Sequence, residues 1–211
     1  MNVDQNIENL KHIRNMMERS TKFLSLSGYS GIAAGIVAMA GAAIAYFVIF
    51  RQGTVKYDEY MRSLSDISTM CIRQQMAALA LSVLVCAVGA AWYFSSRKAK
   101  HAGTRLWTST ARRTLYHFLI PLMTGGIFCM ALILNNNIHL LAAAMLIFYG
   151  LALVNAGKYT VEEVHYLGLS EILLGILAGF LLRYGLLFWT LGFGVMHIVY
   201  GIRMFHKYDR R

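Results

Sequence analysis

Long apolar stretches separated by short charged segments dominate the sequence. The longest stretch, from Thr114 to Gly157, contains no Asp, Glu, Lys or Arg, and only Asn135–Asn137 interrupts it. A hydrocarbon core of ~30 Å needs about 20 apolar residues per helix, so this stretch accommodates two crossings and a turn. The same pattern along the chain predicts an all-α membrane protein with six spans, at Leu24–Phe50, Gln75–Ser95, Leu115–Leu134, Ile138–Gly157, Leu167–Leu182 and Gly185–Phe205.

More polar segments flank this apolar region at both ends. Residues 1–22 carry apolar side chains at three- and four-residue steps, with charged side chains on the opposite side. This spacing is typical of an amphipathic helix. We therefore expect a cytoplasmic amphipathic helix at 1–22, a six-helix transmembrane domain at 23–206 and a cytoplasmic tail at 207–211. The first helix could pack beneath the bundle, lie in the membrane surface or dock on a cytoplasmic protein partner.

Two motifs recur within the apolar spans. The motif Gly-x-Ser-x-Ile-x-x-Gly-Ile-x-Ala occupies residues 28–38 and returns at 168–178. The motif Met-x-Ile-x-Tyr-Gly occupies residues 145–150 and returns at 196–201. The pattern predicts three related hairpins of consecutive spans. Repeats are common in membrane transport folds, although reuse of one helix-packing solution produces the same pattern.

Composition and charge support a membrane location. Of the 211 residues, 57% are hydrophobic and 14% are charged, against about 25% charged in an average soluble domain. With the N-terminus in the cytoplasm, the inner segments hold 15 of the 20 Lys and Arg residues. Cytoplasmic loops carry such an excess of basic residues, so we expect both termini in the cytoplasm. The net charge of +10 then follows from the topology.

The expected partners are those of a membrane protein. The basic loop from Arg97 to Arg113 predicts contact with anionic lipid. Nucleic-acid binding is not expected, because no nucleic-acid-binding motif accompanies the basic residues. Small residues such as Gly31, Gly35 and Gly175 predict close helix packing, within the chain or in a homo-oligomer. The three cysteines show no disulfide or metal-site spacing, so no metal or cofactor is expected.

Glu171 is the only acidic residue inside a predicted span. Charged groups in a membrane are energetically costly and are functional candidates by default. The polar residues His197, Asn155, His117 and Ser30 also lie toward the predicted inner ends of their spans. We therefore hypothesise a small-ligand or proton site in the cytoplasmic half, formed by these five residues. The alternative is that each side chain reaches interfacial water separately.

Two other kinds of chemistry agree less well with the sequence. Gly28–Gly31 reads Gly-Tyr-Ser-Gly, and together with His197 it is similar to the serine and histidine of rhomboid proteases. In rhomboids, however, the serine motif lies in the fourth span and faces outward, and a histidine–asparagine pair precedes it. His117 and His197 could in principle ligate a haem, but lone membrane histidines more often pack or form hydrogen bonds. The sequence therefore predicts no catalytic residues and no enzymatic activity.

Segments at both ends of the chain carry a family resemblance. The segments Ile13–Ser20, Phe23–Gly28, Gly185–Trp189 and His197–Gly201 resemble a family of small bacterial six-span inner-membrane proteins of uncharacterised activity. The resemblance implies a bacterial inner (plasma) membrane and no particular reaction. We expect a non-enzymatic membrane protein with a binding, sensory or partner-regulating role on its cytoplasmic side. The alternative is a transporter or channel for a small solute or for protons.

Overall fold

The computed structural model describes residues 27–49, 68–103 and 107–209, and these residues form helices and turns with no strand among them. The predicted amphipathic helix at 1–22 lies outside the described residues. The elements in chain order are α2 (Gly28–Ile44), the π-helical η1 (Ala45–Ile49), α4 (Ser68–His101), α5 (Ser109–Leu134), the short η2 (Ile138–Leu140), α6 (Leu141–Gly157) and α7 (Glu162–Phe180). A last span follows, made of η3 (Leu182–Tyr184), α8 (Gly185–Trp189), the π-helical η4 (Thr190–Met196), α9 (His197–Met204) and the π-helical η5 (Phe205–Asp209).

Within the described residues, six helices are long and apolar enough to cross a membrane, which confirms the predicted number. Several helices extend past the apolar stretches that predicted them. Helix α7 begins at Glu162, five residues earlier than predicted. Helix α5 begins at Ser109, because the side chain of Thr108 accepts a hydrogen bond from the backbone N–H of Ala111 at 3.1 Å and caps the helix.

The polar triplet Asn135–Asn137 forms the turn between α5 and α6. Asn136 has φ = 57°, in the left-handed region that Asn tolerates better than most residues. The N–H of Asn137 donates to the carbonyl of Leu132 at 2.8 Å and closes the turn. The longest uncharged stretch of the sequence is therefore an antiparallel helical hairpin.

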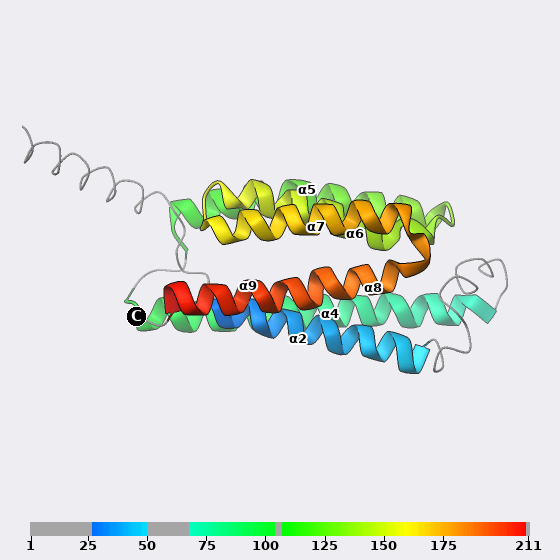
Figure 1. The fold of residues 1–211 in the computed structure, drawn as a ribbon, viewed down its shortest axis with the longest axis horizontal. Helices are drawn as coiled ribbons and strands as arrows, with labels where there is room; N and C mark the ends of the chain where they lie inside the picture. Colours follow the sequence, from blue (N-terminus) through cyan, green and yellow to red (C-terminus); the bar gives the residue numbers. More distant parts are fainter. Residues whose placement is uncertain (1–26, 50–67, 104–106, 210–211) are drawn as a thin grey trace, which may run out of the picture.

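The six spans form two layers, seen one above the other in Figure 1. One layer contains α5, α6 and α7, and the other contains α2, α4 and the last span. The chain passes between the layers twice, once between α4 and α5 and once through η3 between α7 and α8. We call these layers the upper and lower half-bundle, after their places in the figure.

Glycines bring one pair of helices in each half-bundle into backbone contact. A Cβ atom on Gly150 of α6 would lie 2.6 Å from the carbonyl oxygen of Gly168 of α7. A Cβ atom on Gly201 of α9 would lie 2.6 Å from the carbonyl oxygen of Gly28 of α2. All four glycines belong to the repeated motifs, so the motifs make the same contact twice. These contacts cross the predicted hairpins, and a third equivalent hairpin is not confirmed.

The outer surface is largely apolar. Large hydrophobic side chains are exposed on several helices. Examples are Leu81 and Val85 of α4 and Ile127 and Leu134 of α5, which are 62–76% exposed. Exposed Trp and Tyr side chains lie toward the ends of the spans, at Tyr29, Tyr46, Trp92, Tyr93, Trp107, Tyr116, Tyr166 and Tyr184. Aromatic side chains of this kind prefer the membrane–water interface. The fold and its surface are compatible with a multi-pass membrane protein.

Candidate intramembrane polar site

Glu171 lies at the centre of α7 and is completely buried. It is nine residues from the first residue of the helix, or roughly 14 Å at ~1.5 Å per residue. It therefore lies deeper along its span than the sequence indicated, because α7 begins earlier than predicted. The carboxylate faces the last span, which belongs to the lower half-bundle.

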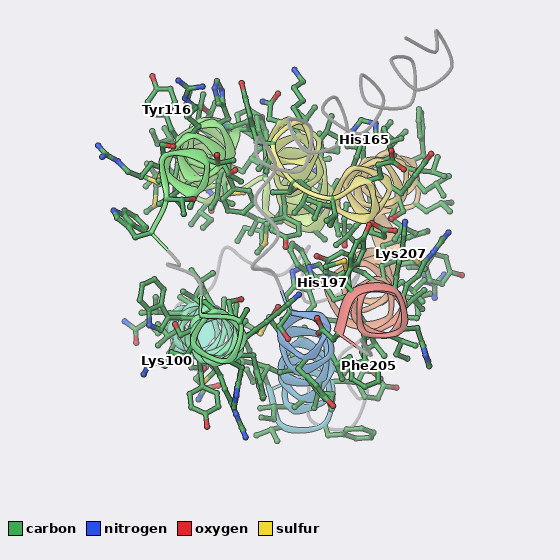
Figure 2. All side chains as sticks on the ribbon, turned by 90° about the vertical axis from the view of Figure 1, so that its left-hand side faces the viewer. Lys100, Tyr116, His165, His197, Phe205 and Lys207 are labelled. Atoms are coloured by element: carbon green, nitrogen blue, oxygen red, sulfur yellow. The ribbon has the colours of Figure 1, made fainter. Side chains whose placement is uncertain are left out.

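His197, the first residue of α9, is the nearest partner of Glu171 and lies in the interior between the half-bundles (Figure 2). Its Nδ1 is 3.4 Å from Oε1 of Glu171 and 3.1 Å from the carbonyl oxygen of Gly192. Because a carbonyl oxygen only accepts, Nδ1 carries the proton of this hydrogen bond. The Nε2 atom lies 2.8 Å from the hydroxyl of Tyr149 on α6. In the neutral imidazole, Nε2 therefore accepts from the Tyr149 hydroxyl.

Gly192 allows the carboxylate to lie directly against the last span. A Cβ atom at this position would collide with Oε2 of Glu171 and with the side chain of Leu146. The residue belongs to η4, the π-helical segment that ends immediately before His197. Such π-helical turns are rare, and they often occur at functional sites. Here the segment supplies both the space for the carboxylate and the carbonyl that orients the imidazole.

Apolar and aromatic side chains enclose the polar group. Leu146 is completely buried, and it packs with Phe188 and Phe193 of the last span. The ring of Phe193 lies 5.0 Å from that of Tyr149 and 6.0 Å from that of His197, measured between centroids. We name the three titratable side chains Glu171, His197 and Tyr149 the polar triad. The triad combines one carboxylate, one imidazole and one phenol inside an apolar shell.

The electrostatics of the triad are unbalanced. Neither carboxylate oxygen of Glu171 accepts a hydrogen bond from any of the described residues. Its closest basic group is His197, whose Nδ1 lies 3.4 Å from Oε1 but donates its proton to the carbonyl of Gly192. An ionised carboxylate without donors is strongly disfavoured in an apolar interior. The two carboxylate oxygens are thus free to accept hydrogen bonds from a small group that carries N–H donors.

The structure places the other three predicted site residues in different contacts. His117 of α5 stacks on Tyr159 at 4.9 Å between centroids, and its Nε2 lies 3.2 Å from the Tyr159 hydroxyl. The hydroxyl of Ser30 donates to the carbonyl of Ser27 within its own helix start. Asn155 is half-buried on α6, six residues beyond Tyr149, which is about 9 Å along the helix. Only Glu171 and His197 of the predicted set contact each other directly.

A second polar contact joins the half-bundles near the start of α7. The buried carboxylate of Glu163 accepts from Nζ of Lys207 at 2.6 Å and from the hydroxyl of Tyr208 at 3.1 Å. The Lys207 side chain labelled in Figure 2 lies beside α7 at this end. Because Glu163 and Glu171 are eight residues apart, they share one face of α7. Both carboxylates of this face therefore contact the last span.

Asp209 closes the lower half-bundle at the same end. Its Oδ2 accepts from the backbone N–H of Gly28 at 2.7 Å and from the hydroxyl of Ser27 at 3.2 Å. Its Oδ1 lies 2.7 Å from Nζ of Lys98 on α4. A carboxylate is favourable at a helix N-terminus, where backbone N–H groups are unpaired. Asp209 thus connects the end of the last span to the start of α2 and to the end of α4.

Sequence reasoning missed Tyr149, Gly192 and Asp209 as functional or structural polar contacts. Tyr149 belongs to a recurring motif, and that motif by itself indicates only a repeat. Gly192 carries a weak signal, since it and Gly194 form a Gly-x-Gly in the last span. Asp209 lies in the predicted tail, but helical structure continues through it.

Comparisons with models of known families, with curated proteins and with solved structures find no match to this chain.

Proposed function

We propose that this chain is a non-enzymatic integral membrane protein with a binding or sensory role, and that the polar triad is its site. The supporting observation is a fully buried carboxylate, Glu171, whose oxygens receive no hydrogen bond from the described residues. The ligand class that balances this site is a proton or a small cationic group with N–H donors. His197 and Tyr149 would orient that group and share its charge.

The physical argument concerns charge in a medium of low dielectric constant. With a neutral imidazole, the triad carries one negative charge in an apolar shell. Uptake of a proton or a cation makes the site neutral and removes most of the desolvation penalty. The free energy of the folded state therefore depends on occupancy of the site, which is the property that a sensor needs.

The proposal includes a cellular setting. We place the chain in the inner (plasma) membrane of a bacterium with both termini in the cytoplasm. The orientation is based on the excess of Lys and Arg in the segments assigned to that side, and the bacterial membrane on the sequence resemblance described above. Anionic lipid would contact the basic loop from Arg97 to Arg113. A cytoplasmic protein partner or a second copy of the chain would transmit the response.

The proposal is tested by infrared difference spectroscopy on the purified chain in lipid. Acidification should produce the C=O band of a protonated buried carboxyl group, and Glu171→Gln should remove it. The matched control is Glu162→Gln, which makes the same change at an exposed position of the same helix. A band that is unchanged in the Glu171→Gln variant would refute proton binding at this site. Repeating the measurement with Na⁺, K⁺, ammonium and guanidinium separates the cation classes.

A second candidate function is proton-coupled or cation-coupled transport. It is favoured by the position of Glu171 at the centre of its span, since transporter sites lie near the middle of the membrane. The test is flux of protons or labelled cations in proteoliposomes. Flux lost on Glu171→Gln and kept on Glu162→Gln would rank transport above sensing. Absence of flux in the native chain, with the infrared band present, would leave sensing as the function.

A further inference from the structure

The two half-bundles are built around equivalent helix pairs. In the upper pair, a Cβ atom on Gly175 of α7 would lie 2.9 Å from the backbone nitrogen of Ile147 of α6. In the lower pair, a Cβ atom on Gly35 of α2 would lie 3.0 Å from the backbone nitrogen of Ile198 of α9. The two sets of residues are the same motif positions, 140 and 51 residues apart. Together with the Gly150–Gly168 and Gly28–Gly201 contacts, this register makes α2 equivalent to α7 and α9 equivalent to α6.

Contacts within each pair differ in kind from contacts between the pairs. Within a pair, glycine lets one backbone pack against the other, so sliding or rotation would create overlap at several positions at once. Between the pairs, side chains of one half pack on side chains of the other, and at Gly192 the Glu171 carboxylate lies against the backbone of the last span. Buried Met204 of α9, for example, packs with Val164 and Leu167 of α7. Side chains can change rotamer and repack at smaller cost than a backbone contact can. Among the described residues, the boundary between the half-bundles therefore lacks the series of backbone-to-glycine contacts that joins the helices within each pair.

The polar side chains that join the half-bundles lie on this boundary, which we call the seam. The triad crosses it at the centre of the spans, where Glu171 and Tyr149 of the upper half meet His197 of the lower half. Glu163 crosses it near the end, where it pairs with Lys207 and Tyr208. The repeat also shows that the seam is chemically one-sided. The motif position equivalent to Glu171 is Gly31, and the position equivalent to His197 is Leu146.

We infer that the two half-bundles move as rigid bodies about the seam and that occupancy of Glu171 sets their relative position. The inference rests on the proposed function, since it needs a proton or a cation at Glu171. The desolvation penalty of an ionised Glu171 favours an opened seam in which water reaches the carboxylate, whereas a neutral Glu171 favours a closed seam. Ligands move a two-state equilibrium only by binding the two states differently, and the unbalanced charge at the seam supplies that difference.

The experiment measures distances between spin labels on the full chain in lipid vesicles. Labels at Val85 of α4 and Ile127 of α5 report across the seam, and both positions are more than 60% exposed. Labels at Val85 and Val199 report within the lower half-bundle. Labels at Ile127 and Leu173 report within the upper half-bundle. The native cysteines, Cys71, Cys86 and Cys129, are first replaced by alanine.

Acidification and Glu171→Gln should both shift the Val85–Ile127 distance by at least about 2 Å, the scale of helix shifts at switching interfaces. Both within-half distances should stay constant. The inference is overturned if all three distances stay the same, or if within-half and cross-seam distances change together. It is also overturned if the acid-induced shift persists in Glu171→Gln.

Other titratable groups face the same seam, so the pH response needs controls. Beside Glu171 itself, these are His197 of the last span and Tyr149 of α6 within the triad. Tyr200 packs on the same apolar cluster as Tyr149, and Glu163 pairs with Lys207 near the end of the seam. Glu163→Gln should leave the shift in place if Glu171 controls it, and loss of the shift in this variant would overturn the inference. If Glu171→Gln does not fold, Gly192→Ala serves instead, because its Cβ would push on the carboxylate. An infrared band at Glu171 without any distance change leaves the proposed function standing and removes this inference.

Discussion

At the residue scale, Glu171 illustrates how little a buried charge contributes to stability by itself. Its carboxylate is buried away from water, and the nearest basic atom among the described residues is Nδ1 of His197, 3.4 Å from Oε1. Continuum arguments and mutagenesis agree that such a group is costly unless it is neutralised. A costly group at the centre of a span is explained most simply by a role in binding.

Changing Glu171 and changing His197 should affect stability in opposite directions. Glu171→Gln removes the buried negative charge, so we expect the free energy of unfolding at neutral pH to rise by about 1–3 kcal/mol. His197→Ala leaves the Gly192 carbonyl and the Tyr149 hydroxyl without their partner, so we expect a loss of about 1–3 kcal/mol. Thermal unfolding of both variants in one detergent provides the measurement. Equal losses in the two variants would contradict an unbalanced carboxylate.

Gly192→Ala tests the close approach of the last span to Glu171. The added methyl group would collide with Oε2 of Glu171 and with Leu146, and overpacking of this kind costs about 1–3 kcal/mol. The loss should be smaller when Glu171 is also alanine, which a double-mutant cycle measures. The matched control is Gly89→Ala in α4, where the new Cβ meets no described atom within 4 Å. That variant should be neutral or more stable by up to about 1 kcal/mol, since Ala favours helix.

At the element scale, the spans differ in the kind of contact through which they pack on their neighbours. Helices α6, α7, α2 and α9 pack through backbone-to-glycine contacts, whereas α4 and α5 each pack mainly on one neighbour and expose most of their apolar surface. The last span is also irregular, because π-helical segments precede and follow α9. The element that carries His197 is therefore less regular than the elements that support it.

Equivalent glycines in the two pairs should be equally sensitive to substitution. Gly150→Ala and Gly201→Ala each place a methyl group against a carbonyl oxygen and a backbone nitrogen of the neighbouring helix. We expect each to lower the free energy of unfolding by about 1–3 kcal/mol. Gly126→Ala of α5, which meets no described atom within 4 Å, is the control. A loss at only one of the two motif glycines, measured by thermal unfolding, would argue against the equivalence of the pairs.

Asp209 should stabilise the start of α2 from a distant part of the chain. Asp209→Ala removes the acceptor of the Gly28 N–H and the partner of Lys98. Loss of a helix cap costs about 0.5–2 kcal/mol. The backbone amides of the first turn of α2 should then exchange faster with deuterium. Asp209→Asn keeps an acceptor for the N–H and should restore most of the protection, while unchanged exchange in Asp209→Ala would exclude a capping role.

At the scale of the whole molecule, the apolar exterior and the two half-bundles must be considered together. An exterior of this composition is suited to lipid. In such a medium apolar side chains gain little by choosing one neighbour over another, so the polar contacts between the half-bundles determine how the halves fit together. The two carboxylates among these contacts, Glu163 and Glu171, lie on one face of α7, and Tyr149 of α6 completes the set. Movement between the halves would therefore be controlled from that face.

The proposed topology makes a prediction for the whole chain in its membrane. In a cysteine-free background, Asn136→Cys in the α5–α6 turn should react with a membrane-impermeant maleimide added outside intact cells. Thr110→Cys at the opposite end of α5 should react only after the membrane is made permeable. The reversed pattern would show that the termini lie outside, against the distribution of Lys and Arg.

The sequence by itself determined the number of spans and the α5–α6 turn, and it singled out Glu171 as a candidate. These properties follow from local composition, because a run of about 20 uncharged residues suits the membrane whatever its neighbours do. It also revealed the repeated motifs, but not which helices they join. The pairing of α6 with α7 and of α2 with α9 depends on backbone approach at glycines far apart in the chain.

Only the tertiary structure decided the composition of the site. Glu171 and His197 meet because the last span packs against α7 and Gly192 of its π-helical segment leaves room for the carboxylate. His117 and Ser30 are residues of the types expected in a polar site, yet their hydrogen-bond partners are Tyr159 and the carbonyl of Ser27. Apolar pattern specifies which segments enter the membrane, whereas the direction in which each polar side chain points depends on helix rotation and crossing, which the pattern does not encode.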